Sequence, residues 1–228
     1  MIIKLADQIV KDISSLNWRQ LSFLSTMILV MLVLCLYWNE SALGIISGIT
    51  GVITVFLVNM RKITNYFWGL INVVIYGWLA YQATYFGDAM LNWGFYLPIQ
   101  FIGAYMWYNS MDGEEVISRK LDTFTAIPMF IGATLLVYMY SKFLGFIGGS
   151  LSVPDATTTV LSVIATFLMV KGYREQWLAW IAVNIISIYM WVAVFTATGS
   201  AGIGVLLMWI MFLINSIYGT YTWFKAAK

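Results

Sequence analysis

The chain has 228 residues, of which 61% are hydrophobic and only 10% are charged, and its mean hydropathy is +0.84. A soluble domain carries roughly a quarter charged residues. The charges here avoid the long apolar runs, so the composition indicates a polytopic membrane protein embedded in the lipid bilayer. The absence of histidine removes the commonest metal ligand, and the one cysteine, Cys35, is expected to be a buried, inert thiol. We therefore expect no metal, no cofactor and no nucleic-acid partner.

The N-terminal residues 1–19 mix charges such as Lys4 and Asp7 with apolar residues such as Ile3 and Ile9. No small-residue cleavage site follows the apolar positions, so this segment is predicted to be an amphipathic surface helix rather than a cleaved signal peptide.

Eight apolar stretches follow, each near the roughly 20 residues that a membrane-spanning helix needs. Only Asn39, Glu40 and Ser41 separate the first two, which therefore form a tight hairpin unless the first lies flat on the membrane. The stretches run from Leu21 to Trp38, Ala42 to Met60, Tyr66 to Tyr85, Met90 to Tyr108, Ala126 to Phe146, Ala156 to Val170, Trp177 to Thr198 and Ile203 to Phe224.

The basic residues support eight spans, because the connecting segments then alternate between the two sides of the membrane. Only Lys142 falls on one side. The other side holds Lys4, Lys11, Arg19, Arg61, Lys62, Arg119, Lys120, Lys171, Arg174, Lys225 and Lys228. The positive-inside rule then places both termini in the cytoplasm. A peripheral first stretch would move three of these charges outside and break the rule.

The chain also nearly repeats itself. Trp93, Gly103, Tyr105 and Trp107 recur 116 positions later as Trp209, Gly219, Tyr221 and Trp223, and Trp68 and Asn72 recur 112 positions later as Trp180 and Asn184. Spans two to four form the first copy and spans six to eight the second, with span five between them. An even displacement of four spans makes the copies parallel, as in many transporters. We expect an all-α fold with a leading segment (1–41), a three-helix repeat (42–110), a polar loop and linker helix (111–150) and a second repeat (151–228).

The chemistry of the spans argues against catalysis. No Asp, Glu, Lys or Arg is predicted deep inside any of the eight stretches, and such residues are the usual marks of pumps, proton relays and intramembrane proteases. The sequence therefore predicts no catalytic residue, and a carrier that works by facilitated diffusion rather than by a proton or sodium gradient. A sodium site built from backbone carbonyls stays open.

Four carboxamides, Asn72, Gln100, Asn184 and Asn215, fall near the centres of predicted spans. An unpaired amide in hydrocarbon costs several kcal/mol, so each needs a partner or a wet cavity. Hydrogen bonds between helices, worth about 0.6 kcal/mol each, are one explanation. Four amides at matched depth in both copies favour a shared polar cavity instead.

Aromatic residues follow the same helical faces. Trp68, Asn72 and Tyr76 are spaced i, i+4, i+8, and Trp180, Asn184, Ser187 and Trp191 form the counterpart stripe. The tryptophans near span ends, Trp93, Trp107, Trp209 and Trp223, are expected in interfacial belts. Gly103 and Gly219 are expected to allow close helix packing, and Pro98 to kink its span.

These residues resemble a known group. The repeat plan is similar to that of the SWEET sugar facilitators. Closer still are the PnuC-type vitamin transporters, which resemble this chain at Trp180-Ile-Ala-Val-Asn184, Ile188-Tyr189-Met190-Trp191, Gln100-Phe-Ile-Gly-Ala-Tyr105-Met-Trp107 and Asn215-Ser-Ile-Tyr218-Gly-Thr-Tyr221-Thr-Trp223. The resemblance covers about residues 42–228. It implies transport of nicotinamide riboside across a bacterial inner membrane and adds Tyr189 and Tyr218 to the candidate substrate-binding residues. The run Ala104-Tyr105-Met106-Trp107 departs from the family's Tyr-Gly-Trp-Tyr pattern, which leaves the substrate open.

The residue types suit that substrate, because nicotinamide riboside has a flat cationic ring, an amide and a ribose. Aromatic faces attract the ring, and carboxamides bond the amide and the hydroxyls. The full candidate set is Trp180, Asn184, Trp68, Asn72, Gln100, Asn215, Tyr76, Ser187, Tyr189 and Tyr218. Thiamine, riboflavin or a sugar is the alternative cargo. A sensor subunit is disfavoured because the longest loop, Met111 to Asp122, is too short for an output domain. Whether copies associate into a homo-oligomer stays open.

Overall fold

The computed structural model describes residues 2–60, 62–110, 120–171, 173–199 and 202–226. Their regular elements are helices, ten α-helices and one short π-helical segment, η1. In chain order these are α1 (Ile2–Ser14), α2 (Trp18–Tyr37), α3 (Ala42–Asn59), α4 (Asn65–Gln82), α5 (Phe86–Met90), η1 (Leu91–Tyr96), α6 (Leu97–Ser110), α7 (Thr123–Phe146), α8 (Ser152–Val170), α9 (Gln176–Thr198) and α10 (Ile203–Ala226).

Six of these helices, α2, α3, α7, α8, α9 and α10, are long and apolar enough to cross a membrane. The two remaining predicted spans correspond to α4 and to the run from α5 to α6. α4 has 18 residues but carries Asn65, Asn72 and Gln82 beside its aromatic residues, and the α5–α6 run is divided into three short elements. The all-helical membrane architecture is confirmed, whereas six rather than eight helices satisfy length and hydropathy by themselves.

The division of the fourth predicted span has a local cause. Pro98 lacks the backbone N–H that would continue the α-helical ladder, and its ring crowds the preceding turn. The helix widens to the π form over Leu91–Tyr96, just before this proline, and returns to α-helix at Leu97. A π segment rotates the residues before it relative to those after it. The structure thus departs from a regular α-helix just before Pro98, the residue at which the sequence predicts a kink.

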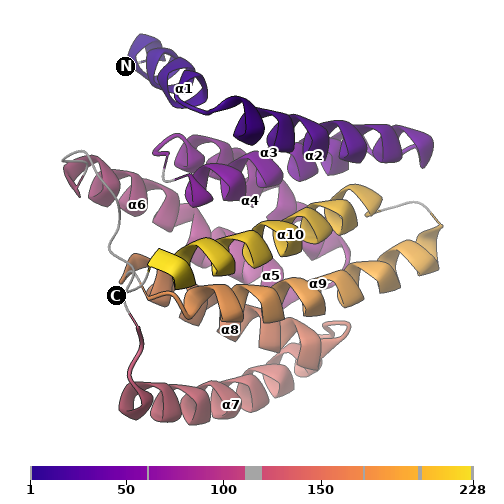
Figure 1. The fold of residues 1–228 in the computed structure, drawn as a ribbon. Coiled ribbons are helices and arrows are strands. Elements are labelled where there is room, and N and C mark those ends of the chain that lie inside the picture. The colour runs from indigo at the N-terminus through magenta and orange to yellow at the C-terminus, as the bar shows by residue number, and fades with distance from the viewer. Residues whose placement is uncertain (1, 61, 111–119, 172, 200–201, 227–228) are drawn as a thin grey trace.

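The core consists of two groups of three helices, the first being α3, α4 and the α5–η1–α6 run, and the second α8, α9 and α10 (Figure 1). In the first group α3 and the α5–α6 run pack on α4. In the second, α8 and α10 pack on α9 in the same way. The groups meet along two seams, α3 against α10 and α5 against α8. α2 packs outside α3 and α10, and α7 outside α8, so these two helices flank the core.

Turns between helices define two ends of the bundle. We call one the acidic end, which carries Glu40, Asp88 and Asp155. There the turn after α4 meets the turn after α7, since the Ser150 N–H donates to the Thr84 carbonyl oxygen at 3.1 Å and the Thr84 hydroxyl donates to Ser150 Oγ at 2.7 Å.

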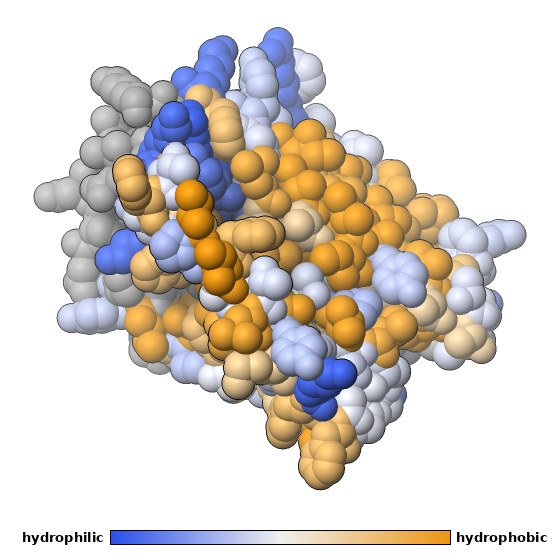
Figure 2. Space-filling view, turned by 90° about the horizontal axis from the view of Figure 1, so that it is seen from below, coloured by the Kyte–Doolittle hydropathy of each residue, from blue (hydrophilic) through white to orange (hydrophobic). Residues whose placement is uncertain are grey.

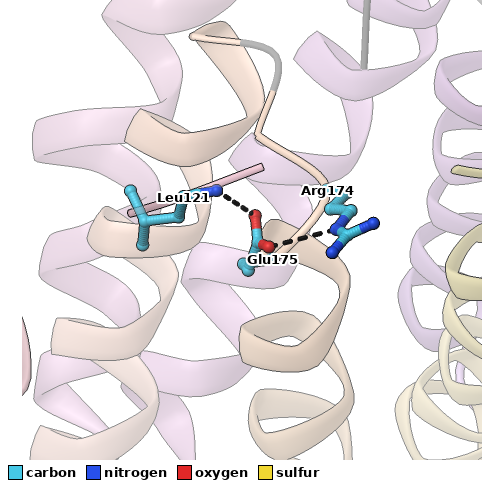
Figure 3. Close-up of polar contacts among 3 residues, drawn as sticks. All are labelled: Leu121, Arg174 and Glu175. Carbon is cyan, nitrogen blue, oxygen red and sulfur yellow. Dashed lines mark hydrogen bonds and ion pairs between the residues drawn. The ribbon is translucent and has the colours of Figure 1, made fainter. Parts of the chain in front are cut away.

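We call the opposite end the basic end, which carries Lys62, Arg174 and Lys225. There Glu175 accepts a hydrogen bond from the Leu121 N–H at 3.0 Å and pairs with Arg174 at 3.2 Å (Figure 3). These contacts fix the segment before α7 against the turn before α9.

The N-terminal helix also docks at the basic end. Asp12 is buried, and its carboxylate accepts hydrogen bonds from the Thr64 hydroxyl at 2.7 Å and the Thr64 N–H at 3.2 Å. The predicted N-terminal helix is present as α1, and Asp12 attaches it to the turn before α4.

The outer surface is apolar over a wide area, as Figure 2 shows for the face seen from below. Much of α7 contributes exposed side chains such as Phe130, Leu135 and Met139, which suits contact with lipid tails. Cys35 is buried and free, as predicted.

Candidate functional site: a cavity between the two three-helix groups

A cavity of about 180 Å³ lies between the two groups. Every helix of both groups contributes to its wall, whereas α1, α2 and α7 contribute no described residue. Its wall reaches Asn65 and Gln176, the first residues of α4 and α9 at the basic end, and extends in the other direction to Tyr76 and Asp88. The space is far larger than one water molecule needs.

All four central carboxamides predicted from the sequence line this cavity. Asn72 Nδ2 donates to the Ser47 carbonyl oxygen at 2.8 Å, and Asn184 Nδ2 donates to Ser216 Oγ at 2.9 Å. Hydrogen bonds between helices are therefore present as well as the cavity. Among the described residues, the side-chain carbonyl oxygens of Asn72 and Asn184 accept no hydrogen bond, so both are available to a donor in the cavity.

Asn215 connects the cavity wall to α3. Its Nδ2 donates to the Val55 carbonyl oxygen at 3.2 Å, and its Oδ1 accepts from Asn59 Nδ2 at 3.1 Å. Gln100 lies against Gly69, where a Cβ atom would come within 2.5 Å of Gln100 Oε1. The glycine on α4 leaves room for this amide.

Aromatic rings form a continuous wall beside the amides. The ring centroid of Trp209 lies 5.9 Å from that of Tyr76 and 5.2 Å from that of Phe212, and Trp180 lines the same space. Trp191 stands behind Tyr76, with ring centroids 5.8 Å apart.

The assignment of Trp209 to an interfacial belt was wrong, since the side chain is buried and lines the cavity. Its repeat partner Trp93 is more exposed and packs against Gly77, outside the cavity. The π segment that contains Trp93 gives the two halves different registers here. Trp223 is buried against Trp177, with ring centroids 6.0 Å apart, rather than placed in a belt. The side chain of Trp107 lies outside the described residues.

Close packing at the repeated glycines is confirmed. A Cβ atom on Gly103 would lie 2.5 Å from the Tyr66 ring, and one on Gly219 would lie 2.6 Å from the Trp177 ring. Both rings lie near the start of the middle helix of their group.

Four predicted site residues do not line the cavity. Trp68 packs edge-on against Phe67, and Ser187 is fully buried between helices. Tyr189 and Tyr218 are 57% and 45% exposed on the outer surface. Helical spacing placed Trp68 and Ser187 on the predicted stripes, but it could not say which edge of each stripe meets the facing helix. Tyr189 and Tyr218 came from the family resemblance.

The sequence places no acid deep inside a span, but two acids at the margins of the predicted spans are buried in the structure. Asp88 is 3% exposed and Asp155 is 0% exposed. The sequence placed both in connecting segments, just outside the fourth and sixth apolar stretches. In the structure Asp88 lies within α5, and α8 already begins at Ser152, so both carboxyl groups belong to helices.

Each of these carboxyl groups has hydrogen-bond donors. Asp155 Oδ2 accepts from the Gly87 N–H at 2.8 Å and Oδ1 accepts from the Asp88 N–H at 2.9 Å, which caps the first turn of α5. Asp88 Oδ2 accepts from the Tyr76 hydroxyl at 2.6 Å. Of the two, only Asp88 lines the cavity.

Sequence reasoning also missed two donors near the basic end. Gln176 and Trp177 line the cavity, and within the described residues Gln176 Nε2 and Trp177 Nε1 are buried without a hydrogen-bond partner. Their spacing was a usable signal, because Trp177, Trp180 and Asn184 are separated by three and four positions on one helical face.

The chain matches known proteins over most of its length. A family model described as nicotinamide mononucleotide transporter matches residues 41–225. The nicotinamide riboside transporter PnuC of Haemophilus influenzae is 38% identical over 193 residues, covering 83% of this chain and 82% of that protein. The protein of the same name from Neisseria mucosa is 35% identical, covering 83% and 74%. A crystal structure of the vitamin B3 transporter PnuC superposes with a TM-score of 0.80 at 31% identity, covering 93% of both chains.

Proposed function

This chain belongs to the PnuC family of membrane transporters, and we propose that it carries nicotinamide riboside into the cell. The family is one of transporters and not of enzymes, which agrees with the absence of catalytic residues in the sequence-based prediction. The description of the family model names nicotinamide mononucleotide as the substrate, whereas the names of the relatives give nicotinamide riboside. We therefore compare how well the cavity wall suits each of these two substrates.

The observation that carries the choice is the charge of the cavity wall. Among the described residues that line it there is no Lys or Arg, and there is one acidic residue, Asp88. A phosphate monoester would bring up to two negative charges into this low-dielectric space without a basic partner, and close to a carboxyl group. The riboside has the same ring, amide and sugar without the phosphate, so the wall favours it.

We assign substrate contact to six of the residues that the sequence predicted, and add Trp209. The aromatic faces of Tyr76, Trp180 and Trp209 suit the ring by stacking and by cation–π attraction, at about 0.5–2 kcal/mol per contact. The amides suit the substrate carboxamide and the ribose hydroxyls, because each offers both a donor and an acceptor. These amides are Asn72, Gln100, Asn184 and Asn215.

We propose eight spans, with α4 and the α5–η1–α6 run crossing the membrane beside the six apolar helices. The charge distribution supports cytoplasmic termini, which would make the basic end cytoplasmic and the acidic end periplasmic. The SWEET-like plan of one leading helix and two parallel triplets is supported by the equivalent packing of α3–α4 and α8–α9. A reporter fused after Lys228 should read as cytoplasmic, and a periplasmic reading would reject this topology.

Transport is proposed to proceed by alternating access between the triplets, down the substrate gradient. Retention inside the cell would then require a separate enzyme that modifies the cargo, and phosphorylation is the natural modification. Asp88 and Asp155 are buried near the acidic end, so a lack of acids is no longer an argument against coupling of transport to a proton gradient. The final internal concentration of substrate in an uptake experiment distinguishes coupled from uncoupled transport.

The test is uptake of labelled nicotinamide riboside into proteoliposomes that contain this chain alone. Uptake should stop at equal internal and external concentrations and should not respond to a protonophore. Unlabelled riboside should compete, whereas the mononucleotide should not. Competition by thiamine, riboflavin or a sugar, without competition by the riboside, would move the cargo to that class.

Asn184→Leu should weaken riboside binding while the protein stays inserted and folded, because the cavity loses both a donor and an acceptor. Tyr189→Leu is the matched control, since this exposed side chain lies outside the cavity. Equal affinities of the two variants would remove Asn184 from the site.

A further inference from the structure

One wall residue of the cavity differs in kind from all the others. Asp88 is buried, and it is the one charged side chain among the described residues of the wall. Its Oδ2 accepts from the Tyr76 hydroxyl at 2.6 Å and its Oδ1 from the Thr158 hydroxyl at 3.4 Å. Asp88 forms no ion pair with a Lys or Arg of the described residues; the ion pair found among them joins Arg174 to Glu175.

The position of this carboxyl group is fixed by an aromatic chain. Trp191 Nε1 donates to the Tyr76 hydroxyl oxygen at 3.2 Å, which leaves the Tyr76 proton directed at Asp88. The same tyrosine ring lies next to Trp209, with centroids 5.9 Å apart. A flat ring that stacks on this aromatic wall therefore comes to rest beside the carboxyl group.

Hydrogen bonds to the carboxamides cannot separate a charged ring from an uncharged ring of the same shape. The carboxamides meet the amide and the sugar, which are identical in the oxidised and the reduced riboside. Stacking supplies a modest preference for the cation. A buried carboxylate without a basic partner supplies a larger one, because the bound cation compensates a charge that is otherwise costly to bury.

We propose that Asp88 is the counter-ion of the substrate's pyridinium ring, and that it makes the site selective for the positively charged riboside over its uncharged dihydropyridine form. The inference rests on the proposed function and extends it to the residue that reads the charge of the ring. It also orients the cargo. The ring lies toward the acidic end, and the ribose lies toward the basic end, where Gln176 Nε2 and Trp177 Nε1 are donors without partners among the described residues.

The experiment compares binding of nicotinamide riboside and dihydronicotinamide riboside to the purified full chain by calorimetry. The wild-type protein should bind the charged form more tightly. Asp88→Asn keeps an acceptor for the Tyr76 hydroxyl and should weaken binding of the charged form at least about tenfold, while binding of the uncharged form changes less than about twofold. Asp88→Glu, which keeps the charge, should retain part of the preference.

The matched control is Glu40→Gln. It removes a carboxylate of the same sign at the same end of the bundle, but Glu40 lies outside the cavity and holds the Gly204 N–H at 2.8 Å. The ratio of the two affinities should stay at the wild-type value in this variant. A similar fall of this ratio in Glu40→Gln would show that the summed negative charge of the acidic end, rather than Asp88 specifically, favours the charged riboside.

Equal weakening of both ligands by Asp88→Asn would overturn the proposal, because a merely structural aspartate affects both alike. Unchanged affinities for both ligands in that variant would overturn it as well. A wild-type protein that binds neither form would instead reject the proposed function, so the two failures are distinguishable.

Discussion

The α3–α10 and α5–α8 seams join the two three-helix groups through equivalent helices, but contacts extend along most of the first seam and along only part of the second. In the α3–α10 seam, Glu40 Oε2 accepts from the Gly204 N–H at 2.8 Å at the acidic end, and Asn59 bonds Asn215 at 3.1 Å nearer the basic end. Between them the backbones approach closely, since a Cβ atom on Gly48 would lie 2.9 Å from the Gly204 carbonyl oxygen. This seam is held along most of its length.

The α5–α8 seam is held at the acidic end. There Asp155 accepts two backbone N–H groups of α5, and Thr158 approaches Asp88. Beyond η1 the run continues as α6, which packs on α4, and the described residues of α6 and α8 share no comparably extensive packing.

Glu40, just before α3, caps the start of α10, and Asp155, in the first turn of α8, caps the start of α5. Both seams are therefore closed at the acidic end by a carboxyl group that accepts backbone N–H groups, and they differ toward the basic end. We infer that α3–α10 acts as the fixed side and that separation of the groups toward the basic end occurs between α6 and α8. Three changes test this difference and a fourth, outside both seams, serves as a reference; they are given from the largest expected effect to the smallest.

The largest effect is expected for Gly204→Leu in the α3–α10 seam. Its Cβ atom would lie 2.7 Å from the Gly44 carbonyl oxygen, which is backbone and cannot rotate away. Overpacking of this kind costs about 1–3 kcal/mol, and we expect the upper end of that range, measured as a lower midpoint of thermal unfolding in detergent. Gly132→Leu on α7 is the control, because no atom lies within 4 Å of the added Cβ. Equal midpoints for the two variants would show that the seam tolerates separation.

The next effect is expected for Asp155→Asn in the α5–α8 seam. The asparagine keeps one acceptor but turns an N–H donor toward the second backbone N–H, so one of two buried hydrogen bonds is lost. Loss of a hydrogen bond to a charged group costs about 1.5–3 kcal/mol. Glu40→Gln should cost less, because Glu40 is only partly buried and accepts one N–H from α10. The two unfolding midpoints rank the seams, and a larger loss in Glu40→Gln would reverse the ranking.

A smaller effect is expected for Asn59→Leu, which removes the donor to Asn215 Oδ1. Hydrogen bonds between helices in membranes average about 0.6 kcal/mol and reach about 1.7. If the pair acts as a unit, the stabilities of Asn59→Leu, Asn215→Leu and the double variant should be non-additive. Additive losses would mean that the contact does not help to hold the basic half of the α3–α10 seam.

The smallest effect lies outside both seams, at the start of α7. Hydrogen bonds from the Thr125 hydroxyl and N–H lower the pKa of Asp122 below its ordinary value. A lowered pKa contributes stability that is complete above the unfolded-state pKa of about 3.9 and is lost as the pH falls through the folded-state pKa. Asp122→Asn retains a good N-cap residue but does not titrate. Its unfolding midpoint should fall slightly less than that of the wild type between pH 5 and pH 3, and identical slopes would contradict the assignment.

Several parts of this organisation were predictable from residue patterns. The apolar runs located the helices, because a segment without polar groups has to satisfy its own backbone in lipid. The amides at the centres of spans, such as Asn72 and Asn184, were placed in one cavity correctly. The buried acids were not, since Asp88 and Asp155 stand at the margins of apolar runs, where a charge is normally solvated. They are buried because helices from two different groups cover them.

What the sequence by itself determined is therefore the membrane class, the helical content and the polar and aromatic stripes, all of which depend on local composition and on the 3.6-residue period. Tertiary structure alone decided which of the candidate side chains meet the cavity, so Trp209 lies inside it and Trp68 and Tyr189 do not. It also decided that Asp155 caps α5, a contact over 67 and 68 positions of sequence. Such contacts depend on how two rigid helices are rotated against each other, and no pattern within either helix specifies that rotation.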